Sequence, residues 1–171
     1  MSTMNVLICQ QPKELVWKQR EIPIPGDNEA LIKIKSVGIC GTDIHAWGGH
    51  QPFFSYPRVL GHEICGEIVG LGKNIADLKN GQQVAVIPYV ACQQCPACKS
   101  GRTNCCEKIS VIGVHQDGGF SEYLSVPVAN ILPADGIDPQ AAALIEPFAI
   151  SAHAVRRAAI APGEQVLVVG A

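Results

Sequence analysis

Five of the eight cysteines fall in one short segment, and four of them form the pattern Cys92-x2-Cys95-x2-Cys98-x7-Cys106. Four thiolates on a loop that contains Gly and Pro can close tetrahedrally around one Zn²⁺. Four protein ligands would fill the coordination sphere and leave no position for a substrate. We therefore expect a structural zinc that fixes a long loop with little core of its own. Cys105 lies beside Cys106, and the spacing leaves it open as the fourth ligand instead.

Other uses of clustered cysteines remain as alternatives. An iron–sulfur site also uses C-x2-C-x2-C, but the common bacterial motif closes with x3-C-P. A redox dithiol could use Cys95-Pro96-Ala97-Cys98, although it needs two cysteines rather than four. Chance clustering of buried thiols is a further possibility. A disulfide framework would need an oxidising compartment, and the first residues show no signal peptide.

The composition excludes several classes of protein. Of 171 residues, 47% are hydrophobic and the net charge is only −2, whereas disordered chains combine low hydrophobicity with high net charge. The 13 Lys and Arg are offset by 15 Asp and Glu, which argues against nucleic-acid binding through phosphate neutralisation. No apolar run approaches the ~20 residues that a transmembrane helix needs. We expect a soluble cytoplasmic protein that binds neither nucleic acid nor membrane.

The first 130 residues read as short strands separated by Gly and Pro. Residues 30–37 alternate, with Ile32 and Ile34 on one face and Lys33 and Lys35 on the other, as a half-buried strand requires. Several short strands at this spacing indicate a mostly β barrel or sandwich. The further strand candidates are residues 6–9, 64–69, 83–87 and 120–126.

The pattern changes to helical near Asp138, which is placed as the N-cap of a helix over 139–145. Glu146-Pro147 is expected to interrupt this helix, and a second helix is expected over 148–159. Residues 165–169 form an apolar run typical of a buried parallel strand. The final Gly170-Ala171 matches the start of a dinucleotide-binding βαβ unit, so we expect the first half of a longer protein.

A second group of zinc-competent residues follows two strand-like runs, in Cys40-Gly41-Thr42-Asp43-Ile44-His45 and in Gly61-His62-Glu63. The second motif is not a helical zinc-protease site, since Gly66 stands where a second His would be required. Taken singly, Cys40 is more often a buried small hydrophobe and His62 a hydrogen-bonded loop histidine. Their significance comes from occurring together.

These motifs also occur together in a known family. They are the two segments above, Gly66-x5-Gly72, the four-cysteine loop, Gly118-Gly119-Phe120-Ser121-Glu122-Tyr123 and the final Val-Leu-Val-Val-Gly. On these residues the whole chain resembles the zinc-dependent medium-chain alcohol and polyol dehydrogenases. The resemblance implies an incomplete GroES-like catalytic domain over 1–146. Residues 147–171 would be the linking helix and first strand of a truncated Rossmann domain.

The resemblance also implies roles for single residues. Cys40 and His62 correspond to two ligands of a catalytic zinc, and Glu146 matches the third, as in the sorbitol and threonine dehydrogenase branch. The alternative for Glu146 is a solvated carboxylate at a helix end. Glu63 would be a nearby carboxylate that ligates the metal transiently or through water. Asp43 would orient a ligating imidazole.

The reaction implied is hydride transfer from a secondary hydroxyl to a nicotinamide, with zinc acting as a Lewis acid. Thr42 would accept the alcohol proton and His45 would pass it to solvent. Gly41, Thr42 and Gly170 would contact the cofactor, NAD or NADP.

The expected substrate is a polyol or a sugar acid such as L-galactonate, with threonine as the alternative within the family. The resemblance further implies a homo-oligomer at full length and no activity for 171 residues alone. The rival interpretation is a non-catalytic module that binds zinc through the four-cysteine loop only.

Overall fold

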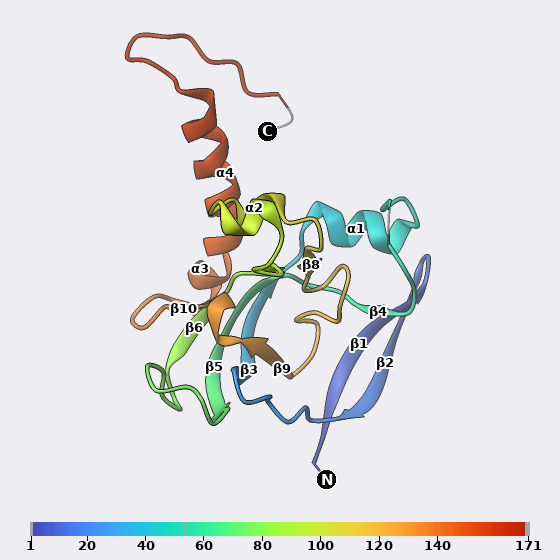
Figure 1. The fold of residues 1–171 in the computed structure, drawn as a ribbon. Coiled ribbons are helices and arrows are strands. Elements are labelled where there is room, and N and C mark those ends of the chain that lie inside the picture. The colour runs from blue at the N-terminus through green and yellow to red at the C-terminus, as the bar shows by residue number, and fades with distance from the viewer. Residues whose placement is uncertain (1, 53, 170–171) are drawn as a thin grey trace.

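A computed structural model describes residues 2–52 and 54–169 (Figure 1). Its central element is a five-stranded antiparallel sheet in the order β10-β6-β5-β3-β9. The strands of this sheet are β3 (Glu29–Gly38), β5 (Glu63–Leu71), β6 (Gln83–Val86), β9 (Tyr123–Pro127) and β10 (Ile131–Pro133). The predicted strands over 30–37, 64–69 and 83–87 are confirmed. The one expected over 120–126 begins only at Tyr123.

A second sheet of three strands packs beside the first, in the order β2-β1-β4. It contains β1 (Thr3–Gln11), β2 (Glu14–Glu21) and β4 (Arg58–Val59). The two sheets are joined where Leu7 N donates to Phe120 O at 2.8 Å and where Val6 bridges to Ser121. The joined sheets form the β barrel that the sequence predicts, including the strand expected over 6–9.

Apolar side chains of the five-stranded sheet make the principal core. Ala30 and Ile32 of β3 are fully buried while Lys33 and Lys35 are exposed, so the predicted alternation is confirmed. Burial of this apolar surface is the main favourable contribution to folding. The core cluster comprises Ala30, Ile32, Ile64, Ile68, Val84, Val86, Ile112, Val126 and Ile131.

The cysteine segment forms a separate lobe at one end of the barrel. The short strands β7 (Tyr89–Val90) and β8 (Ser110–Val111) pair at its base. Between them lie one short helix, α2 (Pro96–Lys99), and a single 3₁₀ turn, η1 (Thr103–Cys105). Because the lobe contains so little regular structure, its buried core consists mainly of its cysteines.

Three longer helical segments complete the described chain: α1 (Gly41–Gly48), α3 (Pro139–Ala143) and α4 (Ile145–Ala158). A further 3₁₀ turn, η2 (Val128–Asn130), precedes β10. Figure 1 shows α1 above the sheets and α4 extending away from them. Among the residues described, no helix is both long and apolar enough to cross a membrane.

Asp138 caps α3 as predicted, accepting hydrogen bonds from Gln140 N at 2.9 Å and Ala141 N at 3.2 Å. The predicted helix break at Glu146-Pro147 is wrong, because the two helices meet at Leu144 instead. Pro147 falls in the first turn of α4. Proline is tolerated there because its missing N–H would have no partner within the helix.

The strand predicted over 165–169 is also wrong for this structure. These residues form neither helix nor strand, and their apolar side chains are exposed. A strand is stabilised by a neighbouring strand that satisfies its backbone groups, and none of the described strands pairs with this run. The expected domain boundary at 146/147 lies inside α4 and stays a prediction.

Two neighbours on β5 test the assignment of the core. Ile68 is fully buried, whereas the next side chain, Val69, is 37% exposed. Ile68→Ala should lower the free energy of unfolding by about 2–5 kcal/mol, since it removes packed methylenes and leaves a cavity. Val69→Ala should cost about 0.5 kcal/mol. Urea denaturation measures both, and equal losses would contradict this placement of the core.

Candidate metal centres

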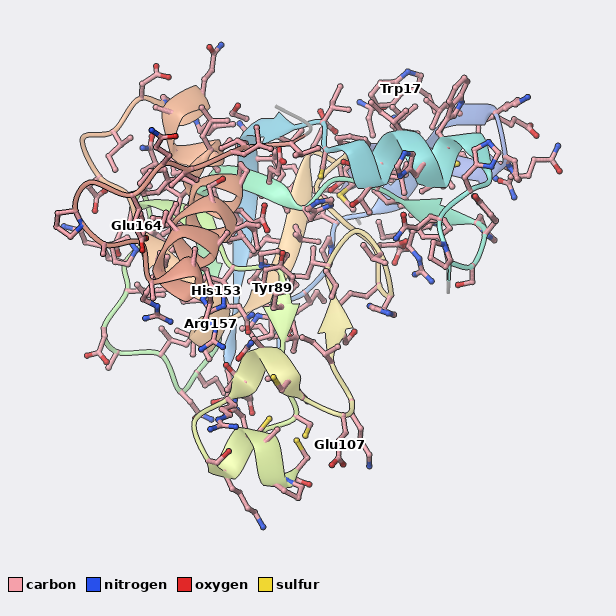
Figure 2. All side chains as sticks on the ribbon, turned by 90° about the horizontal axis from the view of Figure 1, so that it is seen from above. Trp17, Tyr89, Glu107, His153, Arg157 and Glu164 are labelled. Carbon is pink, nitrogen blue, oxygen red and sulfur yellow. The ribbon has the colours of Figure 1, made fainter. Side chains whose placement is uncertain are left out.

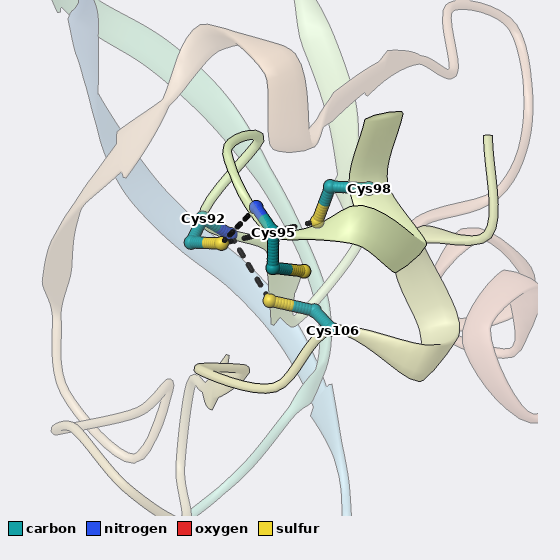
Figure 3. A group of neighbouring side chains, drawn as sticks. All are labelled: Cys92, Cys95, Cys98 and Cys106. Carbon is teal, nitrogen blue, oxygen red and sulfur yellow. Dashed lines mark hydrogen bonds between the residues drawn. The ribbon is translucent and has the colours of Figure 1, made fainter. Parts of the chain in front are cut away.

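The four predicted cysteines converge on one point (Figure 3). The sulfur atoms of Cys92, Cys95, Cys98 and Cys106 all lie within 4.8 Å of one another. Cys105, the alternative fourth ligand, is exposed and lies outside this group, while Cys106 is buried. The geometry therefore favours Cys106 as the fourth ligand. We call these four residues the four-cysteine group.

Backbone amides already stabilise negative charge on this group. Cys95 N donates to Cys92 Sγ at 3.4 Å, and Cys92 N donates to Cys106 Sγ at 3.3 Å. Backbone N–H groups of Gln94 and Cys95 lower the pKa of Cys92 to about 6. Burial raises the pKa of Cys98 to about 12, which favours the protonated form of that thiol. A divalent cation would let this thiol ionise as well, which is the chemistry of a tetrahedral zinc site.

A second group of possible ligands lies where β3 leads into α1 and where β5 begins. Donor atoms of Cys40, His62 and Glu63 lie within 4.8 Å of one another. His62 and Glu63 are 6% and 7% exposed, and Cys40 is half-buried. The structure thus brings together three of the predicted site residues from two segments that are twenty residues apart. We call them the Cys40–His62 group.

Asp43 holds these two segments together. Its Oδ2 accepts from Cys40 N at 2.9 Å, and its Oδ1 accepts from Gly61 N at 3.0 Å. Oδ1 also lies 3.7 Å from His62 Nδ1, a buried nitrogen that has no hydrogen-bond partner among the described residues. With Nδ1 turned to Asp43, Nε2 is the nitrogen left for a metal, as in many carboxylate–histidine–zinc arrangements. The orphaned ring nitrogen fits the role that the sequence predicts for Asp43.

Gly38 makes room for Glu63, and the sequence analysis missed it. The two residues face each other in the pairing of β3 with β5. A Cβ on Gly38 would lie 1.9 Å from Glu63 Oε2, so any larger residue would displace the carboxylate. The available signal was a glycine in an otherwise regular strand pattern, which often marks a close approach.

The predicted third ligand, Glu146, lies beside the Cys40–His62 group rather than in it. Its Oε1 accepts a hydrogen bond from the Tyr89 hydroxyl at 2.5 Å. Burial raises the pKa of Glu63, and the negative charges of Glu146 and Asp43 raise it further while His62 opposes them. The negative charges of Glu146 and Asp43 thus act on Glu63, and a bound cation would relieve this repulsion.

Tyr89 is the second residue that the sequence analysis missed. Burial, followed by the hydrogen bond to Glu146, raises the pKa of Tyr89 well above its usual value. Its hydroxyl therefore remains a neutral donor at neutral pH. No motif signals this role, because Tyr89 and Glu146 are 57 residues apart in the chain.

Gly41, Thr42 and His45 lie on α1, and they are expected to contact the cofactor or to transfer the proton. Thr42 is half-buried in the first turn and His45 is exposed, three residues further along the same helix face. A Cβ on Gly41 would meet no atom within 4 Å, so the backbone there faces open space. The proton relay and the cofactor contacts stay predictions, and Gly170 lies outside the described residues.

Neighbouring cysteines offer a matched test of the four-cysteine group. Cys106→Ser should remove one zinc per chain, because it replaces a buried thiolate ligand with a poor one. Cys105→Ser should leave the zinc content unchanged, since Cys105 is exposed and outside the group. Elemental analysis of the purified variants measures both. Zinc loss in Cys105→Ser alone would reverse the assignment, and iron in the parent chain would indicate an iron–sulfur site.

Gly38→Ala tests the Cys40–His62 group. The added methyl group would lie 1.9 Å from Glu63 Oε2 and push the carboxylate out of the group. Loss of this adjacent carboxylate should weaken zinc binding at the Cys40–His62 group about 10- to 100-fold, with the four-cysteine group still loaded, so zinc content should fall below two per chain. Gly41→Ala is the control, because its Cβ would enter open space. Equal zinc contents in the two variants would contradict this geometry.

Comparison with known proteins agrees with the fold. A family model described as the alcohol dehydrogenase GroES-like domain matches residues 26–136. The chain is 99% identical over all 171 residues to L-galactonate-5-dehydrogenase of Escherichia coli K12, and covers 50% of that protein. It is 34% identical to L-threonine 3-dehydrogenase of Chelativorans sp. BNC1, covering 98% of this chain and 50% of that one.

A solved structure shows the same fold. The alcohol dehydrogenase rspB from Escherichia coli CFT073, complexed with the cofactor NADH, superposes with a TM-score of 0.86 at 40% identity. The match covers 92% of this chain and 46% of that one. The chain thus spans about half the length of the relatives it matches. Because the family model covers most of the described barrel and both candidate metal groups, the chain belongs to the alcohol dehydrogenase GroES-like domain family.

Proposed function

We propose that these residues form the catalytic half of a zinc-dependent dehydrogenase that takes hydride from a secondary hydroxyl of a sugar acid or polyol. The observation that carries the proposal is the Cys40–His62 group, with its donor atoms within 4.8 Å of one another. The 99% identity to L-galactonate-5-dehydrogenase favours L-galactonate as the substrate. The alternative of a module that binds zinc only through the four-cysteine group gives no reason for a second set of buried ligands.

The four-cysteine group and the Cys40–His62 group suit zinc ions with different roles, one structural and one catalytic. Four thiolates fill the coordination of a structural zinc, whereas a thiolate, an imidazole and one carboxylate leave a position open. A zinc ion in the Cys40–His62 group would polarise the substrate hydroxyl and lower its pKa. We propose Glu146 as the third ligand and Glu63 as the adjacent carboxylate. One carboxylate together with the Cys40 thiolate already balances the charge of the metal.

Residues of α1 would move the proton that leaves the substrate. The Thr42 hydroxyl can accept that proton and donate its own. His45 is exposed at the far end of the same helix face and can deliver a proton to water. Imidazole suits this step because its ordinary pKa lies near neutrality.

The hydride requires a nicotinamide, since no side chain can accept it. The rspB relative was solved with NADH, which supports NAD as the acceptor, with NADP as the alternative. Gly41 and Thr42 would contact this cofactor, together with Gly170.

The remaining predictions belong to the same proposal. Residues 1–146 would be the GroES-like catalytic domain, and 147–171 would link it to a Rossmann domain. The complete protein would be a cytoplasmic homo-oligomer that acts on a small molecule and binds no nucleic acid.

Activity is best tested by joining these 171 residues to the second half of the Escherichia coli K12 relative. The joined protein should reduce NAD faster with L-galactonate than with sorbitol or L-threonine, followed by the absorbance of reduced nicotinamide. NADP is tested in parallel. The 171 residues alone should be inactive. A preference for threonine would favour the threonine dehydrogenase alternative, and no turnover with any substrate would contradict the proposal.

Thr42→Ala in the joined protein separates the proton path from metal binding. Loss of a positioned proton acceptor should lower turnover by roughly 10²- to 10⁴-fold, the range for general acid–base groups. Zinc content should stay at about two per chain, because Thr42 is not a proposed ligand. Near-normal turnover would remove Thr42 from the proton path.

A further inference from the structure

We propose that Tyr89 is a positioning residue that aims the Glu146 carboxylate at the metal of the Cys40–His62 group. This inference rests on the proposed function, because it gives Glu146 the role of a ligand. Its starting point is the 2.5 Å hydrogen bond from the Tyr89 hydroxyl to Glu146 Oε1. The bond joins the cysteine lobe to the first turn of α4, two parts of the chain that are far apart in sequence.

The backbone of Tyr89 is held firmly. It pairs with Val111 in the two-stranded sheet at the base of the cysteine lobe. Asn130, which is 7% exposed, donates from Nδ2 to Tyr89 O at 3.1 Å and to Ile87 O at 2.7 Å. Because the backbone of Tyr89 is held by β8 and by Asn130, the position from which its side chain extends is fixed.

Glu146 has no comparable support from its own helix. It is the second residue of α4, and α4 contains no buried residue along its described length. A glutamate on such a helix can adopt many rotamers, and ordering it carries an entropic cost. The Tyr89 hydroxyl selects among these rotamers by binding Oε1, which leaves Oε2 available for a metal.

The helix that carries Glu146 contacts β5, the strand that begins at Glu63. The charge of Glu146 acts on Glu63, and the charges of Cys40 and Glu63 act on the Tyr89 phenol. Carboxylates that bind metals are themselves usually held by hydrogen bonds from neighbouring groups, and these partners set metal affinity. Tyr89 has the position and the chemistry of such a partner.

Replacing Tyr89 with Phe should remove the hydrogen bond and little else. The ring is 37% exposed and lines an open cleft of about 560 Å³ together with Val111, Ile150 and His153. Figure 2 shows Tyr89 and His153 on facing elements, in the cysteine lobe and on α4. The substitution therefore leaves no buried cavity and no buried polar group without a partner.

The test is a cobalt titration of the joined protein whose four-cysteine group has first been loaded with one equivalent of zinc. Co²⁺ bound to the Cys40 thiolate gives a charge-transfer absorption, and Cys40→Ser identifies this signal by removing it. Tyr89→Phe should raise the Co²⁺ dissociation constant about 10- to 100-fold. Its visible spectrum should resemble that of Glu146→Gln. Tyr123→Phe on β9 is the matched control and should bind Co²⁺ like the parent chain.

A double variant shows whether Tyr89 acts through Glu146. In the Glu146→Gln background, Tyr89→Phe should cause no further loss of affinity, because its target is already gone. An unchanged dissociation constant in the Tyr89→Phe single variant would overturn the inference. So would equal losses at both metal groups, which would mean that the ring only supports the cysteine lobe. If Glu146→Gln binds Co²⁺ normally, the proposed ligand role of Glu146 fails, and the inference fails with it.

Discussion

The buried carboxylate of Asp43 is the interaction on which the candidate active site depends. It accepts hydrogen bonds from the backbones of Cys40 and Gly61, and so fixes the two turns that carry the possible ligands. A buried charge is costly unless several donors stabilise it, and these two amides supply that compensation. Its remaining neighbour is the unpaired His62 Nδ1 at 3.7 Å. One side chain thus fixes the spacing of the two backbone segments and places a carboxylate beside the imidazole.

The five-stranded sheet and the cysteine lobe constrain the positions of the carboxylates at the candidate active site. Pairing of β3 with β5 places Gly38 opposite Glu63, so the strand register decides where that carboxylate points. The lobe contributes through the hydrogen bond from Tyr89 to Glu146. A metal in the four-cysteine group would therefore stabilise the lobe and, through it, a side chain next to the second group.

The sequence predicted the strands best where one face is buried and alternation is clear, as in residues 30–37. It missed β2, in which most side chains are exposed and which follows a turn at Lys13 without a glycine. It placed the helix break at Glu146-Pro147 because proline usually ends a helix, although a first-turn proline does not. It also assigned a strand to 165–169, where apolar composition alone cannot supply a neighbouring strand.

The sequence by itself determined the types of possible ligand, the spacing of the four cysteines and the presence of both a Cys40 motif and a His62 motif. Thiolate and imidazole chemistry is local to each residue, and short spacings limit how four ligands can close. Only the tertiary structure brought Cys106, and not Cys105, to the other three sulfur atoms, made Gly38 necessary for Glu63 and brought Tyr89 to Glu146. These outcomes depend on burial, strand register and contacts between distant segments, which sequence spacing does not encode.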